Sequence, residues 1–344
     1  MVCLCMTSYA QGTEEPTMPD RAEFAAATAG YRRELLAYCY RFLGSIDEAE
    51  DVVQEIYLRA WRSYATFEHR SSVRTWLYRI ATNACLTAFA QNARRPLPSG
   101  MAGSSSDINV PGIPDGTDIG WLQPFPTAST RPGPSDPAWV IESRGSLRLA
   151  FIAALQLLPP RQRAVLILRD VLAWRAAEVA DLLGISPVAV KSILQRARPN
   201  WQGRLRTRLR SPNRRSLRLR RLLEAYVSAL ENADITTLVQ LLRADARFEM
   251  PPFSTWFEGR DAVARFIGSR VLDRPGTLRL MPTQANGQPA VAAYRRGVDG
   301  VHRAHAIHVL TIDNTSIIRI VAFLDADLFS RFDLPREYPT AAQN

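Results

Sequence analysis

Residues 173 to 198 read AWRAAEVADLLGISPVAVKSILQRAR, and they predict two short helices joined by a tight turn. The first helix places apolar side chains at helical spacing and ends at Gly184, which can adopt the left-handed conformation of a sharp helix exit. Ser186 can cap the second helix through its hydroxyl, and Pro187 suits the first helical position, where no N–H is required. Small residues around the glycine let the two helices cross closely, so the stretch predicts a helix-turn-helix unit.

The outward face of the second helix carries side chains that can read DNA. It consists of Ser186, Val188, Ala189, Lys191, Ser192, Gln195, Arg196 and Arg198. Lysine, serine, glutamine and arginine can bond to base edges in the major groove or to phosphates. Residues 191–221 contain one lysine and 11 arginines without an acid, and such a stretch attracts a polyanion. A solvated helix face is the alternative interpretation, but the cap, the turn and the basic stretch together favour DNA binding.

Length and composition narrow the class of protein. The 344 residues suffice for two or three domains, and the net charge of +10 arises before residue 222, because the rest has 14 acids against 13 bases. No apolar run reaches the roughly 18 residues of a membrane span. The four cysteines, Cys3, Cys5, Cys39 and Cys85, are too few and too scattered for a disulfide framework or a metal site. We therefore expect a cytoplasmic protein without membrane contact, metal or cofactor, in which Cys39 and Cys85 are buried thiols.

Changes in composition divide the chain into five segments. Residues 1–20 predict a disordered leader, 21–92 a helical module, 93–137 a linker, 138–210 a second helical module, and 211–344 a domain of helices and strands. The linker holds nine prolines and six glycines and cannot pack as regular structure. In the last segment, residues 290–296 and 304–312 alternate with the period of two that is typical of strands. The expected fold class is therefore multidomain, with two all-α modules followed by an α+β domain.

Residues 47–63 predict an amphipathic helix with an acidic start. The acids suit the positive end of the helix dipole, which is the simpler interpretation. The polar side also gathers Asp51, Gln54, Glu55 and Arg59, and such a stripe can be a protein-docking face. The residues alone leave both interpretations open.

Residues 67–88 mix aromatic and cationic side chains. Ser71 or Ser72 can cap a helix that begins near Val73, and Trp76 falls at an apolar position and is expected in the core. The side chains expected to face outward are Arg74, Tyr78, Arg79 and Asn83. Aromatic rings stack on bases and guanidinium groups bind the backbone, so this face predicts a surface for single-stranded DNA.

Roughly residues 21–210 resemble an extracytoplasmic-function (ECF) RNA polymerase sigma factor of the sigma-70 family. The resemblance rests on GSIDEAEDVVQEIYLRAW at 44–61, RSSVRTWLYRIATNACL at 70–86 and LQLLPPRQRAVLILRDVLAWRAAEVADLLGISPVAVKSILQRAR at 155–198. It implies that the chain binds the beta and beta-prime subunits of core RNA polymerase. It also implies that the chain binds promoter DNA in both its double-stranded and its melted form.

The same resemblance assigns a role to three of the expected helices. The first would bind the polymerase clamp through Asp47, Glu50, Asp51, Gln54, Glu55 and Arg59. The second would melt and read the −10 promoter element through Arg70, Arg74, Tyr78, Arg79 and Asn83. The third would read the −35 element through the outward face of the helix-turn-helix. The linker would thread towards the active-site cleft of the polymerase.

The last segment resembles the SnoaL-like extension found on one subgroup of sigma factors. The matching stretches are LLEAYVSALENADITTLVQLL at 222–242, MPPFSTWFEGRDAVARFI at 250–267 and HVLTIDNTSIIRIVAFLDADLFSRFDLP at 308–335. The resemblance implies a cone-shaped fold of helices and curved sheet that modulates sigma activity. We expect an internal pocket, for an unknown small molecule, lined by Trp256, Tyr294, His308 and Phe323.

Two other functions stay open, because the cone-shaped fold also occurs in isomerases and cyclases. One is such an enzyme, or a ligand sensor, fused to a DNA-binding helix-turn-helix. Its base would be a carboxylate or a histidine, and His305 and His308 lie on opposite faces of one strand, so at most one points inward. The other is a ligand-sensing repressor, but repressors usually dimerise on palindromes and the sequence shows no dimerisation helix. A sigma factor that is not an enzyme is the favoured prediction.

Overall fold

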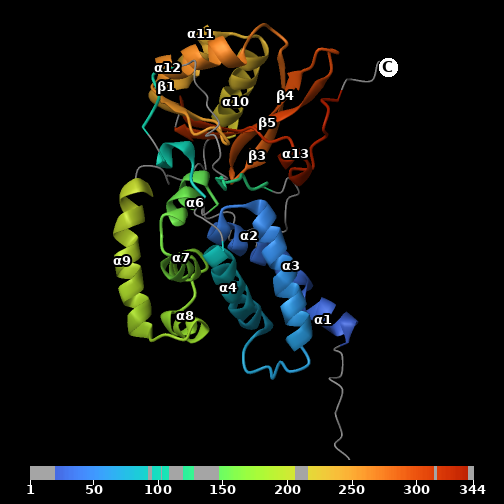
Figure 1. Cartoon of the computed structure of the whole chain (residues 1–344), viewed down its shortest axis with the longest axis vertical. Helices are drawn as coiled ribbons and strands as arrows, with labels where there is room; N and C mark the ends of the chain where they lie inside the picture. The colour runs from blue at the N-terminus through green and yellow to red at the C-terminus, as the bar shows by residue number, and fades with distance from the viewer. Residues whose placement is uncertain are drawn as a thin grey trace, which may run out of the picture.

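The computed structural model describes residues 20–91, 95–101, 103–107, 119–127, 147–205, 216–313 and 316–339. Helices fill one half of the molecule, and a sheet with its own helices fills the other (Figure 1). Nearly all of the predicted leader and most of the predicted linker lie outside the described residues. Within the described ranges, every helix is too short or too polar to cross a lipid bilayer.

The first helical module begins the described chain. It consists of α1 (Arg21–Thr28), η1 (Ala29–Tyr31), α2 (Arg32–Leu43), α3 (Ile46–Ser63) and α4 (Val73–Gln91). Gly44 ends α2 in the left-handed conformation, and the Ser45 hydroxyl caps α3 by accepting from the N–H of Glu48 at 3.2 Å. Ser72 caps α4 by accepting from the N–H of Thr75 at 3.1 Å, which decides between the two predicted caps.

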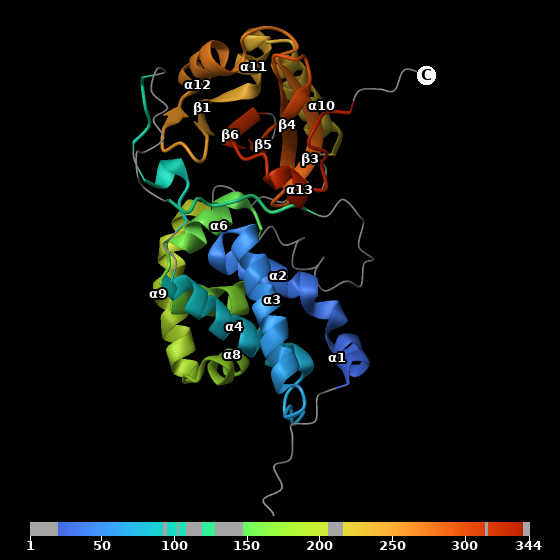
Figure 2. The ribbon, with the colours of Figure 1, turned by 45° about the vertical axis from the view of Figure 1, so that its right-hand side comes forward.

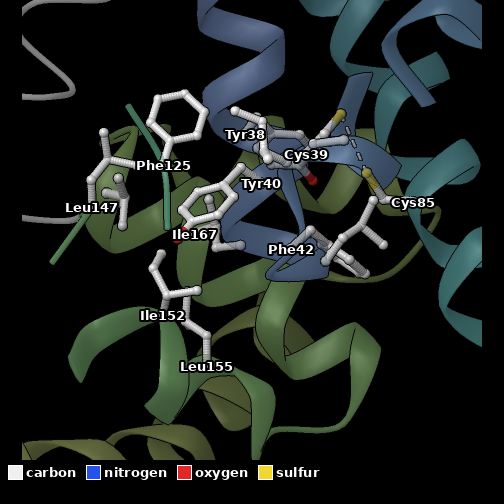
Figure 3. Close-up of a cluster of buried hydrophobic side chains, with 14 of the residues drawn as sticks. Tyr38, Cys39, Tyr40, Phe42, Cys85, Phe125, Leu147, Ile152, Leu155 and Ile167 are labelled. Carbon is white, nitrogen blue, oxygen red and sulfur yellow. Dashed lines mark hydrogen bonds between the residues drawn. The ribbon is translucent and has the colours of Figure 1, made fainter. Parts of the chain in front are cut away.

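Aromatic rings and two thiols fill the space between these helices. Cys39 and Cys85 are both buried with their sulfur atoms 3.6 Å apart, which confirms the prediction of buried thiols (Figure 3). Trp76, predicted in the core, is half-buried and stacks on Phe67 with ring centroids 4.7 Å apart. The apolar stripe of α3 faces the same core, as its periodicity predicts.

The second helical module contains the predicted helix-turn-helix. After η2 (Pro98–Gly100) in the linker come α6 (Leu149–Gln156), α7 (Pro160–Leu166), η3 (Ile167–Val171), α8 (Ala176–Leu183) and α9 (Pro187–Leu205). Gly184 is left-handed at φ 63°, and the Ser186 hydroxyl accepts from the N–H of Ala189 at 3.1 Å, so the predicted turn and cap are confirmed. Helix α9 continues past its predicted end near Arg198, since Pro199 removes one backbone hydrogen bond without ending the helix.

The C-terminal domain, which we call the tail, is an α+β structure as predicted. It consists of α10 (Ser216–Glu231), α11 (Ile235–Leu241), β1 (Leu242–Glu249), β2 (Trp256–Glu258), α12 (Arg260–Phe266), η4 (Ile267–Val271), β3 (Leu278–Ala285), β4 (Gln288–Arg296), β5 (His302–Asp313), β6 (Ser316–Phe323) and α13 (Leu328–Arg331). The strand order is β2-β1-β6-β5-β4-β3, with β1 and β6 parallel and the other neighbours antiparallel. Both predicted strands lie inside β4 and β5.

The two faces of the tail sheet have different partners. One face packs against α10, α11 and α12, and its side chains form one apolar cluster. On this face the hydroxyl of Tyr226 and Nδ1 of His308 lie 3.0 Å apart. The opposite face carries Tyr294 and Phe323, and their cluster continues through Phe329 of α13 into the helical half. Figure 2 shows α13 at the end of the tail that is nearest to α2 and α6.

Candidate DNA and polymerase interfaces

The predicted recognition face of α9 lies open at the surface. Ser186, Val188, Lys191, Ser192, Gln195 and Arg196 are exposed, Ala189 is half-buried, and the side chain of Arg198 lies outside the described residues. The opposite side of α9 packs on α7 and α8 through Val190, Leu194 and Ala197. Exposed cations and an amide in one row are the donors that base edges and phosphates accept. This face can therefore enter a major groove without any rearrangement of the helix-turn-helix.

The polar face of α3 is divided into an open half and a covered half. In the open half Asp51 and Gln54 are exposed, and Arg59 pairs with Glu55 at 2.6 Å. Exposed ion pairs of this kind contribute little to stability, about 0.3–0.5 kcal/mol. Both partners are therefore available to another protein at small cost.

The covered half of α3 is held by the tail and the linker. Arg331 of α13 binds Asp47 at 2.7 Å and also binds Glu50. The side-chain amide of Gln123 in the linker donates to Asp47 at 2.8 Å and accepts from the Ser45 hydroxyl at 2.7 Å. Three distant segments of the chain thus meet at the N-terminus of α3, where the helix dipole also favours carboxylates.

Arg74 and Tyr78 of α4 are covered by the second helical module. The Tyr78 hydroxyl donates to the buried carboxylate of Glu34 at 2.8 Å, and Arg74 Nε donates to the same carboxylate at 3.0 Å. Trp174, from the loop before α8, packs on Tyr78 with ring centroids 5.1 Å apart, and the Arg74 guanidinium lies 5.5 Å from the Trp174 ring. Burial raises the pKa of Tyr78 and the Glu34 carboxylate raises it further, so the hydroxyl stays a donor.

The prediction that Tyr78 faces outward is therefore wrong for this conformation. Helical periodicity places Tyr78 on the polar side of α4, but Glu34 and Trp174 come from other segments and enclose it. Three other predicted side chains remain accessible, since Arg70 and Asn83 are exposed and Arg79 forms an exposed ion pair with Asp181 of α8 at 2.7 Å. The helix-turn-helix module thus covers part of the predicted single-strand surface.

A buried arginine joins the two helical modules. Arg163 of α7 donates to the carbonyl of Phe42 in α2 and to the side-chain oxygen of Gln156 at 3.0 Å. Its guanidinium also lies 4.6 Å from the ring centroid of Phe89 in α4. A buried cation is costly unless acceptors surround it, so this geometry fixes how α7 sits on α2 and α4.

One turn of the tail reaches into the helical half. Asn286, between β3 and β4, is fully buried with φ at 55°, a conformation that asparagine tolerates. Its amide nitrogen donates to the hydroxyl of Tyr40 and to the carbonyl of Leu147, both at 2.7 Å, and its oxygen accepts from the N–H of Phe125 at 2.9 Å. Figure 3 shows Tyr40, Phe125 and Leu147 converging from α2, the linker and the start of the second module. A single amide therefore ties all three to the tail.

The four side chains predicted to line one pocket of the tail do not meet. His308 lies on the α10 side of the sheet, whereas Tyr294 and Phe323 lie on the opposite side. Trp256 packs at the β2 edge, 5.4 Å from the Arg247 guanidinium. Successive residues of a strand point to opposite faces, and composition alone does not reveal which face an aromatic residue occupies. The four side chains therefore do not share one pocket, and this expectation is corrected.

Several residues that join the modules were not predicted from the sequence. They are Gln123, Arg163, Trp174, Asn286 and Arg331. The pair Asn286–Gly287 is a turn signal between two strands, so its local conformation could have been predicted. None of the five lies in a local sequence pattern that would identify its long-range contact.

Comparison with known proteins identifies each module. The chain matches Sigma-70 region 2 over residues 29–95, Sigma-70 region 4 over 148–198 and a SnoaL-like domain over 223–320. The ECF RNA polymerase sigma factor SigG of Mycobacterium tuberculosis (strain ATCC 25618 / H37Rv) is 47% identical over 325 residues, which cover 93% of this chain and 86% of that protein. The chain belongs to the ECF family of RNA polymerase sigma factors.

Two further relatives are similar to different lengths of the chain. The chain is similar to the crystal structure of the Mycobacterium tuberculosis ECF sigma factor SigJ, with 25% sequence identity and a TM-score of 0.57. The match covers 92% of this chain and 100% of the SigJ chain. SigW of Bacillus subtilis (strain 168) is 27% identical over 195 residues, 54% of this chain and 91% of that protein. The sigma factor described here therefore carries regions 2 and 4 together with a SnoaL-like tail. It binds core RNA polymerase and promoter DNA to start transcription, and it is not an enzyme.

Proposed function

We propose that the sigma factor binds the β and β′ subunits of core polymerase through α3, reads the melted −10 element through α4 and reads the −35 element through α9. The open half of α3 and the exposed recognition face of α9 support these assignments. The exposed Arg70, Arg79 and Asn83 support the assignment of α4. We also propose the domain boundaries 21–92, 138–210 and 211–344, and a cytoplasmic site of action, where core polymerase and promoters meet.

The tail lowers activity by competing with polymerase for α3. The observation that carries this proposal is the double ion pair of Arg331 with Asp47 and Glu50. A carboxylate that pairs with Arg331 is less able to pair with a cation of the polymerase. In the same conformation Trp174 covers Tyr78, so polymerase binding and −10 reading are restrained together. We call this arrangement the closed form.

The substitution Arg331→Ala tests the competition directly. Two partly exposed ion pairs together contribute about 1 kcal/mol, so the variant should bind core polymerase about two- to fivefold more tightly at low salt. The affinity of the labelled full chain for core polymerase can be measured by fluorescence anisotropy. The gain should shrink as salt rises, because screening weakens the ion pairs of the parent protein.

Arg336→Ala is the matched control, because Arg336 pairs with Asp327 inside the tail at 2.8 Å. This variant should bind polymerase like the parent. Equal affinities for the two variants would contradict the competition. Weaker binding by Arg331→Ala would contradict it as well, because Arg331 would then assist docking.

A further inference from the structure

A cavity of about 1100 Å³ lies between parts of the tail and of the helical half. Its walls are the β1, β6 and β5 strands of the tail, the start of α10, helix α6 of region 4, and the linker around η2. A volume of this order suits a small organic molecule. Leu222 and Leu310 of the apolar cluster under α10 reach the wall of the cavity, whereas Tyr226 and His308 are not among its lining residues.

The tail side of the cavity is rich in arginine. Its lining includes the four tail arginines Arg218, Arg243, Arg247 and Arg319, with the two acids Asp245 and Asp313. Three of these guanidinium groups are fixed in place by carboxylates, among them Arg247, which binds Glu258 at 2.6 Å. Arg243 binds Asp245 and also Asp313 at 2.8 Å, and Arg319 binds Glu249 at 2.6 Å and the Ser99 hydroxyl at 3.2 Å. Because each of the three is paired with a carboxylate, they give the wall its shape and leave the binding of an anion to another cation.

Arg218 differs from these fixed cations. It lies on the first turn of α10, is exposed, and forms no ion pair with another described residue. Its guanidinium is therefore free to bind an anionic group, and a guanidinium matches a carboxylate or a sulfonate in a forked geometry.

The helical side of the cavity is apolar. One face of α6 supplies Ala150, Ala153, Ala154 and Leu157, and the polar lining residues beside them are Arg148 and Gln156. Leu157 is 46% exposed, so a large apolar side chain opens towards the space. The Arg218 cation opposite an apolar wall fits a molecule that has one anionic end and one apolar body.

We propose that this cavity is a binding site for an amphiphilic organic anion, with its carboxylate or sulfonate at Arg218 and its apolar body against α6. Such a ligand contacts the linker, region 4 and the tail at once. A ligand that binds one arrangement of these parts stabilises that arrangement by its binding free energy. It would therefore favour the closed form. This regulatory consequence rests on the proposed function, whereas the binding itself does not.

The test uses 8-anilinonaphthalene-1-sulfonate, an aromatic sulfonate whose fluorescence rises in an apolar site, titrated into the full chain. Arg218→Ala removes the free cation, and Ala154→Trp fills the apolar side. The matched controls are Arg220→Ala, on the same helix outside the cavity lining, and Ala177→Trp, on the exposed side of α8. Decanoate and decyltrimethylammonium serve as competitors of opposite charge with the same chain length.

We expect Arg218→Ala to bind the probe about tenfold more weakly, as the loss of one charge-assisted contact implies. Ala154→Trp should abolish this binding, and the two controls should match the parent. Decanoate should displace the probe and decyltrimethylammonium should not. Absence of binding to the parent, unchanged binding in Arg218→Ala and Ala154→Trp, or equal displacement by both competitors would overturn the proposal. The polymerase affinity of Arg331→Ala tests the closed form separately, so the two ideas can fail independently.

Discussion

Replacing Trp174 by alanine should release the −10 surface of region 2. The indole contacts Tyr78 through an aromatic pair and Arg74 through a cation–π contact. Aromatic pairs contribute about 0.5–1.5 kcal/mol and cation–π contacts about 0.5–1 kcal/mol, so the covering contact is worth about 1–2.5 kcal/mol. One term opposes these gains, because the indole Nε1 is buried with no acceptor among the described residues. We therefore expect the net contact free energy to be about 1 kcal/mol. Its loss should raise the fraction of molecules with an uncovered −10 surface about fivefold.

Binding of a fluorescent single-stranded oligonucleotide pool to the full chain, followed by anisotropy, measures the released surface. Trp174→Ala should bind the oligonucleotides about fivefold more tightly than the parent, because fewer molecules are in the closed form. Trp174→Phe keeps a ring against Tyr78 and should lie between the two. Circular dichroism and double-stranded DNA binding through α9 check that the module remains folded. If Trp174→Ala and the parent bound the single strands equally, the claim that region 4 covers a functional surface would be refuted.

Two further predictions concern α9 and the tail. Lys191→Ala combined with Arg196→Ala should abolish promoter selection in transcription assays while polymerase binding stays intact. The reason is that each lost base contact costs about 1–3 kcal/mol. Equal loss of promoter selection and polymerase binding would count against the assignment of α9. Burial holds the pKa of His308 at about 3, with His305 adding to the effect, while the unfolded value is 6.5. The folded tail therefore loses stability as pH falls from 6.5 towards 3, by up to about 1.4 kcal/mol per pH unit, and His308→Gln should flatten this loss in thermal unfolding at pH 7 and pH 5.

The local signals in the sequence were reliable because each acts within a few residues. Gly184 and Ser186 define the turn and cap of the helix-turn-helix through their own backbone and the next turn of helix. The same holds for Ser72 at the start of α4. Strands β4 and β5 were predictable because side chains alternate between two buried faces. These elements also carried the resemblance that led to the sigma-factor assignment.

The candidate interfaces were predicted less completely. The recognition face of α9 is exposed as its pattern indicates, because its neighbours α7 and α8 are close in sequence. Tyr78 was misplaced because Glu34 of another helix and Trp174 of the other helical module cover it. The pocket of the tail was misplaced because the strand register decides which aromatic side chains share a face.

The sequence alone determined the helical modules, the turn between α8 and α9, the α+β class of the tail and the family. Tertiary structure alone decided which functional surfaces are open and which are covered. Asn286 bonds to Tyr40 across 246 residues, and Arg331 bonds to Glu50 across 281 residues. Such contacts depend on how whole modules pack, and neither partner carries a local pattern that depends on the other. Short-range backbone preferences fix the elements, whereas the balance between long-range contacts fixes the closed form.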